Sequence, residues 1–156
     1  MVDFIYHNPT KIVFGKNKES LIGAEIAPFG VKKVLLCYGS ERIKSDGLYK
    51  KVTDSLVKEG IAWVELGGVV SNPKLSKVKE GIALAQKEHV EAILAIGGGS
   101  VLDSSKTIAV GALVKNDVWD FFIGKVAIEK ALPIFAVMTL AATGSEMNGF
   151  AVVSNE

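Results

Sequence analysis

Short apolar runs alternate with amphipathic stretches along this 156-residue chain. Continuous apolar runs, long enough for buried strands and too short for helices, occupy residues 34–38, 92–96 and 134–138, and a further strand is predicted at 61–66. Apolar residues that recur every three or four positions predict helices at 17–28, 48–60, 75–85 and 101–114. A short aromatic piece covers 119–123. Because strands alternate with helices, we predict an α/β fold, a Rossmann-like parallel sheet with flanking helices.

The two ends of the chain add β-prone segments to this pattern. Phe4–His7 and Lys11–Phe14 flank Asn8-Pro9-Thr10, which predicts an N-terminal β-hairpin. Phe150–Val153 resembles a final strand that is left unfinished. Because nothing in between resembles a linker or a repeat, we interpret 1–156 as one domain. We expect it to be the first domain of a longer protein.

Composition excludes several classes of function. Apolar residues make up 49% of the chain, charged residues 22%, and the formal net charge is +1. Without a block of like charges, we expect neither nucleic acid nor a membrane surface as a partner. Apolar runs fall short of the roughly 20 residues of a membrane span, and the N-terminus lacks the apolar core of a signal peptide. With one cysteine, Cys37, no intrachain disulfide is possible, and we expect a cytoplasmic protein.

The most informative segment is the glycine turn, Gly97-Gly98-Gly99-Ser100, between a predicted strand and a predicted helix. A helix N-terminus offers unpaired N–H groups and partial positive charge, and glycines let a phosphate approach the backbone. Ser100 could cap the helix and donate to a phosphate oxygen. The segment is not a Walker A motif, since Lys106-Thr107 follows a serine where that motif needs a glycine. A G-x-G-x-x-G fingerprint after the first predicted strand is also missing. A tight turn without a ligand is the alternative.

Three further turns follow predicted strands, at 39–40, 67–72 and 139–145. The carboxyl ends of parallel strands share one sheet edge, where ligands gather. Asn72, and the hydroxyls of Thr139, Thr143 and Ser145, could therefore line a ligand site, although turns and caps explain them too. Asp103 either complements the helix dipole or orients a ligand, and Lys106 is an exposed partner or a phosphate neighbour.

The turn at Gly39-Ser40 bears on the choice of cofactor. An acid near such a strand end would bind the ribose 2′-OH of NAD and repel a 2′-phosphate. This position instead offers Gly39 and Ser40, followed by Arg42 and Lys44, although Glu41 lies between them. The pattern favours NADP, with NAD as the alternative.

Catalytic groups are harder to find. His7 and His89 each stand alone, which is typical of surface histidines, and Cys37 in an apolar strand is typical of a core residue. Neither paired carboxylates nor a Ser/His/Asp set nor an HExxH motif appears. The sequence predicts a cofactor pocket without a catalytic apparatus.

Taken together, the motifs resemble one family. Its pattern is matched in order by Asn8-Pro9-Thr10 with Phe14-Gly15, by Ser71-Asn72-Pro73, by GGGSVLDSSK at 97–106 and by TLAATGSEMN at 139–148. The chain resembles the N-terminal domain of the iron-containing alcohol dehydrogenases, near the butanol dehydrogenases. The resemblance implies a dehydroquinate-synthase-like fold in which an N-terminal α/β domain binds NAD(P) and a helical C-terminal domain holds iron or zinc.

The family reaction is hydride transfer between NAD(P)H and a small alcohol, aldehyde or ketone, with the metal polarising the oxygen. By matching positions, the resemblance implies roles for the following residues. Gly98, Gly99 and Ser100 would contact the pyrophosphate; Thr139, Leu140, Thr143 and Ser145 the adenosine side or the phosphates, with Asn72 nearby; Gly39 and Ser40 would select the cofactor; and Asp103 would approach the nicotinamide.

One departure limits these expectations. The family's metal ligands, an Asp and three His, have no counterpart in this sequence, so we expect the chain alone to be inactive. Without a helical domain, an apolar face would be exposed, and we expect a homo-oligomer. The alternatives are a glycerol dehydrogenase-like or dehydroquinate synthase-like domain, or a non-catalytic nucleotide-binding module.

Overall fold

A computed structural model describes residues 3–5 and 7–156 of the chain. Four parallel strands form one sheet in the order β2-β1-β3-β4. The strands are β1 (Lys33–Tyr38), β2 (Ala62–Leu66), β3 (Ala92–Gly97) and β4 (Ile134–Met138). The α-helices are α1 (Ile22–Ile26), α2 (Arg42–Ser45), α3 (Leu48–Lys58), α4 (Leu75–Lys87), α5 (Gly99–Gly111) and α6 (Trp119–Phe122). The 3₁₀-helices are η1 (Lys18–Leu21), η2 (Ala27–Phe29) and η3 (Ser145–Met147).

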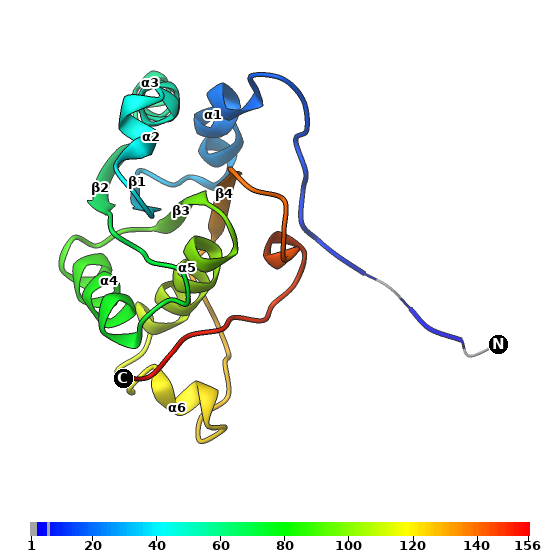
Figure 1. Cartoon of the computed structure of the whole chain (residues 1–156), viewed down its shortest axis with the longest axis vertical. Coiled ribbons are helices and arrows are strands. Elements are labelled where there is room, and N and C mark those ends of the chain that lie inside the picture. The colour runs from blue at the N-terminus through cyan, green and yellow to red at the C-terminus, as the bar shows by residue number, and fades with distance from the viewer. Residues whose placement is uncertain (1–2, 6) are drawn as a thin grey trace.

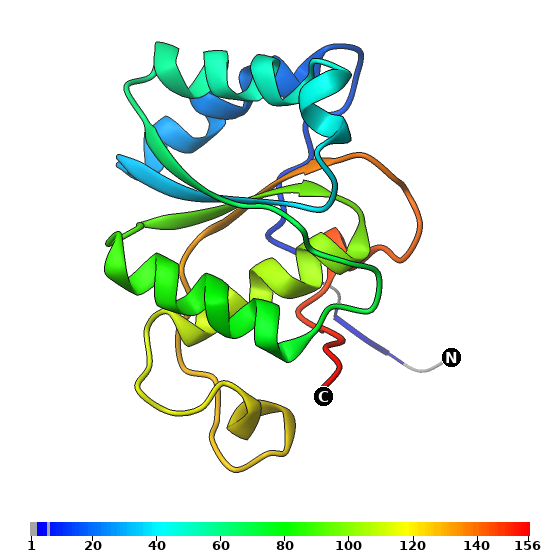
Figure 2. The same ribbon diagram turned by 60° about the vertical axis from the view of Figure 1, so that its left-hand side comes forward.

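Helices cover both faces of the sheet (Figure 1), as the predicted α/β fold requires. Figure 2 shows α1, α2 and α3 above the sheet and α4 and α5 below it. In β1, Val34, Leu36 and Tyr38 join the hydrophobic cluster on the α1–α3 side. Leu35 and Cys37 join the cluster on the other side. This alternation buries both faces of β1, which explains its continuous apolar sequence.

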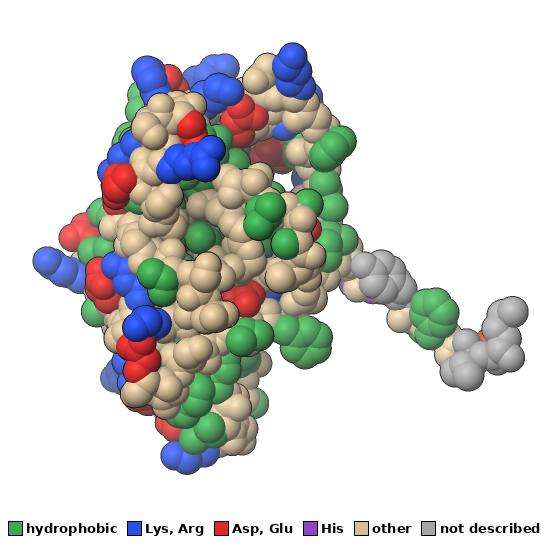
Figure 3. Space-filling model, viewed as in Figure 1, with side chains coloured by type: hydrophobic (Ala, Val, Ile, Leu, Met, Phe, Trp, Pro, Cys, Tyr) green, Lys and Arg blue, Asp and Glu red, His purple; other side chains and the backbone are tan. Residues whose placement is uncertain are grey.

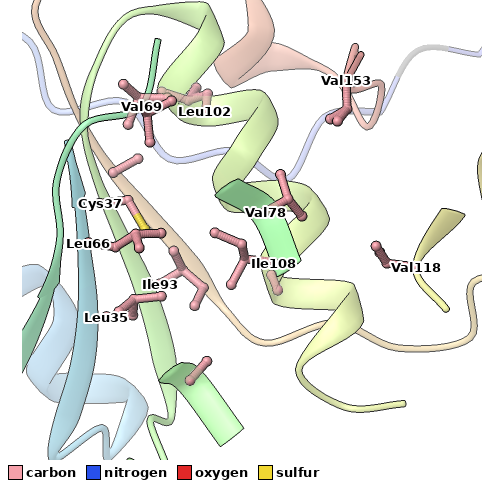
Figure 4. Packing of buried hydrophobic residues seen from close by; sticks show 14 of the residues in the cluster. Leu35, Cys37, Leu66, Val69, Val78, Ile93, Leu102, Ile108, Val118 and Val153 are labelled. Atoms are coloured by element: carbon pink, nitrogen blue, oxygen red, sulfur yellow. The ribbon is translucent and has the colours of Figure 1, made fainter. Parts of the chain in front are cut away.

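The cluster between the sheet and α4 and α5 is shown in Figure 4. Leu35, Leu66 and Ile93 from the strands meet Val78 of α4 and Ile108 of α5. Leu66, Ile93, Val78 and Ile108 are each at most 2% exposed. This packing holds α5 against β3, and the predicted glycine turn joins these two elements.

Two predicted elements are corrected by the structure. The N-terminal hairpin does not form in residues 3–5 and 7–14, where no strand is assigned; Tyr6 lies outside the described residues. Instead Asn8 Nδ2 donates to the Met147 carbonyl (2.9 Å), and Thr10 Oγ1 donates to the Glu146 carbonyl (3.3 Å). An isolated two-stranded hairpin is only marginally stable, so contacts to another segment prevail.

The final strand predicted at Phe150–Val153 is also absent, because side chains of α5 take its backbone groups. Lys106 Nζ donates to the Phe150 carbonyl (2.7 Å), and the Val152 N–H donates to Asp103 Oδ2 (3.1 Å). The strand pairing that remains there is a single bridge between Ser154 and Lys74. No helix in the described part of the chain is long and apolar enough to cross a membrane.

Candidate functional site

The four predicted ligand turns do follow the four strands at one sheet edge. The strand order places a topological switch between β1 and β3. From β1 the chain continues to β2 on one side of this point, and from β3 it continues to β4 on the other side. In open α/β sheets the crevice at such a switch is the usual ligand site. Gly39 follows β1 and the glycine turn spans the end of β3, so these two turns flank the switch.

The glycine turn leads directly into α5. Gly98 is the N-cap, in an extended conformation, and no side chain caps the helix. The Ser100 cap predicted from the sequence is therefore wrong, because Ser100 is already the second residue of α5. The first N–H groups of a helix have no intrahelical partner. An uncapped N-terminus at this edge is suited to an anionic ligand.

A loop of small and hydroxylated residues, 139–148, closes over the glycine turn; we call it the hydroxyl loop. The Thr139 N–H donates to the Gly97 carbonyl (3.1 Å), which fixes the beginning of the loop. A Cβ atom on Gly98 would lie 3.5 Å from Leu140 Cβ, and one on Gly99 would lie 2.4 Å from Thr143 Oγ1. The structure thus brings Gly98, Gly99, Leu140 and Thr143 together, as predicted.

Gly39 lies on the other side of the switch. A Cβ atom at Gly39 would lie 3.1 Å from the Val69 carbonyl oxygen and 3.9 Å from Val101 Cγ2. The turn after β1 therefore lies against both the turn after β2 and the first turn of α5. Ser40 is exposed next to it.

No hydrogen bond joins Asn72 to the glycine turn in the described structure. It is exposed in the turn before α4, with a left-handed φ of 55° that asparagine tolerates better than most residues. Lys74 is the N-cap of α4, so Asn72 does not cap that helix either. Its predicted place beside the cofactor stays a prediction.

Asp103 and Ser145 lie together in the structure, and their side chains form a hydrogen bond with each other. Ser145 Oγ donates to Asp103 Oδ1 (2.6 Å), and Ser145 is only 4% exposed. Lys106 Nζ donates to the same Ser145 Oγ (2.7 Å). The sequence left open whether Asp103 complements the helix dipole or orients a ligand, and whether Lys106 is an exposed partner or a phosphate neighbour. Their spacing of three residues on one helix was the available signal that they act together.

A second polar cluster, which the sequence did not suggest, lies beyond the end of β1. Lys44 Nζ lies 3.0 Å from a carboxylate oxygen of Glu41 and 3.0 Å from one of Glu65. The Tyr38 hydroxyl lies 2.9 Å from Glu41 Oε1 and 3.0 Å from Glu65 Oε2, and its single proton is given to one of the two at a time. Tyr49 donates to Glu65. Burial raises the pKa of Glu65, but the hydrogen bonds from Tyr49, Lys44 and Tyr38 outweigh it and leave this pKa lowered. Lys44 is therefore neutralised by two carboxylates.

The remaining candidates behave as predicted. His7 and His89 are exposed, and Cys37 is buried in β1. Burial raises the pKa of the Cys37 thiol to about 12. Within residues 3–5 and 7–156, no group of three or more His, Cys, Asp or Glu side chains could hold a metal ion.

Comparison with known proteins agrees with this architecture. Residues 9–156 match the family model described as iron-containing alcohol dehydrogenase. The chain is 48% identical over 155 residues to a probable NADH-dependent butanol dehydrogenase 2 of Bacillus subtilis, covering 99% of this chain and 40% of the relative. It is 36% identical to an NADPH-dependent aldehyde reductase of Escherichia coli, with coverage of 100% and 40%.

A crystal structure of NADH-dependent butanol dehydrogenase A from Thermotoga maritima matches with a TM-score of 0.96 and 58% identity, covering 98% of this chain and 38% of that one. The chain thus spans about two fifths of the length of these relatives. The family match covers nearly the whole sequence, and the shared fold includes the glycine turn and the hydroxyl loop. This chain belongs to the iron-containing alcohol dehydrogenase family.

Proposed function

We propose that residues 1–156 form the nicotinamide-dinucleotide-binding α/β domain of an enzyme that transfers a hydride between NAD(P)H and a primary alcohol or aldehyde. The observation that carries this proposal is the uncapped N-terminus of α5 behind the glycine turn, at the switch between β1 and β3. Relatives named as butanol dehydrogenases and aldehyde reductases support the substrate class.

The residues present fit a dinucleotide pyrophosphate. Gly98 and Gly99 lack the Cβ atoms that would fill the cradle, and the first N–H groups of α5 point out of the helix end. In this proposal the N–H groups of Gly99 and Ser100 hold the phosphates, and Thr139 and Thr143 form the opposite polar wall. The bound dinucleotide supplies the hydride carrier. The chain's own part is to bind and orient it.

The metal implied by the family has no ligand cluster among the described residues. We propose that its ligands belong to a helical domain outside these 156 residues, where iron or zinc would supply Lewis-acid chemistry toward the alcohol oxygen. We expect the 156-residue chain alone to oxidise no butanol. Turnover by the purified chain at rates near those of full-length relatives would contradict this expectation.

Titration of the purified chain with NADH, followed by calorimetry, tests the binding proposal. We expect saturable 1:1 binding that ADP weakens by competition. Ser100→Glu should abolish binding, because it puts a carboxylate where the phosphates would lie. Ser76→Glu is the matched control, since Ser76 is the second residue of α4 as Ser100 is of α5. Equal binding by both variants would contradict the proposed site.

The preference between NADH and NADPH needs a separate proposal. The sequence-based preference for NADP rested on Gly39 and Ser40 in place of an acid, with Arg42 and Lys44 shortly after. The ammonium of Lys44, however, is held by Glu41 and Glu65. The butanol dehydrogenases at 43–48% identity carry NADH in their names. We therefore propose that NADH is the preferred cofactor. Comparing the Kd values of the two cofactors tests this, and a lower Kd for NADPH would restore the original prediction.

The homo-oligomer predicted from the sequence also remains a proposal. Phe4, Ile5 and Phe14 are each at least 86% exposed. Figure 3 shows hydrophobic side chains along the N-terminal segment that leaves the body of the molecule. An exposed apolar segment favours association with a second copy. Light scattering that finds a monomer at high protein concentration would contradict it. The cytoplasmic location likewise stays a prediction.

A further inference from the structure

Asp103 and Lys106 lie on α5, just after the glycine turn, and both face the segment that follows β4. Both carboxylate oxygens of Asp103 are occupied: Oδ1 accepts from Ser145 Oγ (2.6 Å) and Oδ2 accepts from the Val152 N–H (3.1 Å). The side chain of Asp103 is 16% exposed and that of Lys106 is 14% exposed. Both oxygens of the Asp103 carboxylate are therefore engaged by the segment that follows β4.

The ammonium of Lys106 is occupied in the same way. Its Nζ donates to Ser145 Oγ (2.7 Å), Asn148 Oδ1 (3.3 Å) and the Phe150 carbonyl (2.7 Å). An ammonium has three N–H donors, so these three acceptors use all of them. Burial lowers the pKa of Lys106, while Asp103 and Glu146 oppose that effect. Lys106 has no donor left for a phosphate in this arrangement.

Ser145 stands at the centre of the network. Its hydroxyl accepts from Lys106 and donates to Asp103, so one buried oxygen links both charges. The preceding residue, Gly144, has a left-handed φ of 64°, and its carbonyl accepts from Asn148 Nδ2 (2.9 Å). Thr143, one residue earlier, places its Oγ1 against Gly99. The position of Ser145 therefore determines where Thr143 meets the glycine turn.

We infer that Asp103 and Lys106 are positioning residues of the dinucleotide site: they hold Ser145 and so keep the hydroxyl loop closed over the glycine turn. Both act through Ser145 and the backbone of 150–152, without touching the ligand. The inference rests on the proposed function, and it replaces a direct role of Asp103 toward the nicotinamide. It also explains why a lysine and an aspartate are buried beside a site for an anion.

Lys106→Met and Ser145→Ala test the inference. Each should raise the Kd for NADH about tenfold, because each removes charge-assisted hydrogen bonds that hold the hydroxyl loop closed. Amide hydrogen exchange should speed up in residues 139–152 and stay unchanged in α3 and α4. Lys77→Met is the matched control, because Lys77 pairs with Glu80 on α4 at the same spacing. It should change neither measurement.

A double-mutant cycle separates positioning from mere stabilisation. If Lys106 acts by placing Thr143, Thr143→Ala should weaken NADH binding in the wild type but add little in the Lys106→Met background. Additive losses, or exchange that rises throughout the molecule, would overturn the inference. If the wild-type chain binds no dinucleotide, the proposed function fails instead. The exchange measurement then still decides whether Asp103 and Lys106 hold the loop.

Discussion

The Oγ1 atom of Thr143 lies 2.4 Å from the position that a Cβ atom would take on Gly99. Real Cβ atoms do not approach an oxygen that closely, so the hydroxyl loop can rest on α5 only because residue 99 is glycine. At Gly98 the nearest atom to such a Cβ would be Leu140 Cβ at 3.5 Å, an ordinary contact. The packing of the hydroxyl loop therefore requires glycine at position 99 but leaves room for a Cβ atom at position 98.

Gly99→Ala should displace Thr143 and destabilise the fold by about 1–3 kcal/mol, the usual range for overpacking. Gly98→Ala should leave the unfolding free energy within about 1 kcal/mol of the wild type. Thr143→Ala in the Gly99→Ala background should restore stability, since Thr143 Cβ would lie an acceptable 3.5 Å away. Chemical denaturation of the four proteins decides it, and equal stability of both glycine variants would contradict the argument.

The fold was predictable because local patterns determine it. The apolar runs in β1 and β3 are continuous since both strands are buried on both faces, and the period of α3 and α4 follows their single apolar face. The hairpin at 4–14 and the strand at 150–153 were wrong for one reason. Their β-prone residues lack a partner strand in the described structure. The first segment binds through its own side chains to carbonyls of 146–147, and side chains of α5 take backbone groups of 150–152.

The site was only partly predictable. Glycines and hydroxyls after strands predicted that the four turns gather at one sheet edge, because parallel strands direct all their carboxyl ends to it. The sequence could not show that Asp103 turns toward Ser145 and Val152, because those contacts join residues more than 40 positions apart. The neutralisation of Lys44 by Glu65 likewise depends on the pairing of β1 with β2.

Gly23 in α1 should be intolerant of a side chain. A Cβ atom there would lie 2.1 Å from the backbone oxygen of Ser55 in α3, and the Gly23 N–H donates to Ser55 Oγ (2.9 Å). Helix propensity alone would make Gly23→Ala stabilising by about 1 kcal/mol. We expect the opposite sign, a loss of about 3 kcal/mol. Ala24→Gly, at the exposed neighbour, is the control for propensity, and a stabilised Gly23→Ala variant would refute the close helix contact.

Glu65→Gln should remove a pH-dependent part of the stability. The lowered pKa of Glu65 means that its charged form is favoured by folding. This contribution is present above the unfolded value near 4.5 and is lost as the pH falls through the lower folded pKa. Denaturation should show a wild-type advantage of about 1 kcal/mol at neutral pH that shrinks in acid. Glu129→Gln, which removes an exposed carboxylate, is the matched control.

Cys37 should be unreactive while the chain is folded. A pKa of about 12 leaves very little thiolate at pH 8. Relative to a free thiol with a pKa near 8.5, labelling should slow by roughly a thousandfold. A chromogenic disulfide reagent can follow this, with the guanidinium-unfolded chain as the control that reacts at once. Rapid labelling of the native protein would show that β1 is accessible.

We predict that substitutions in the turn after β1 alter the cofactor preference. Ser40→Asp places a carboxylate beside Gly39, where it would accept from a ribose 2′-OH and repel a 2′-phosphate. The Kd for NADPH should rise at least about tenfold more than the Kd for NADH. Ser45→Asp adds the same charge on α2 and should affect both cofactors equally.

Glu41→Gln should act in the opposite direction, because it removes one of the two carboxylates that neutralise Lys44 and so improves NADPH binding. If both Ser40→Asp and Glu41→Gln changed the Kd values for NADH and NADPH equally, the turn after β1 would not select the cofactor, and the prediction would be wrong.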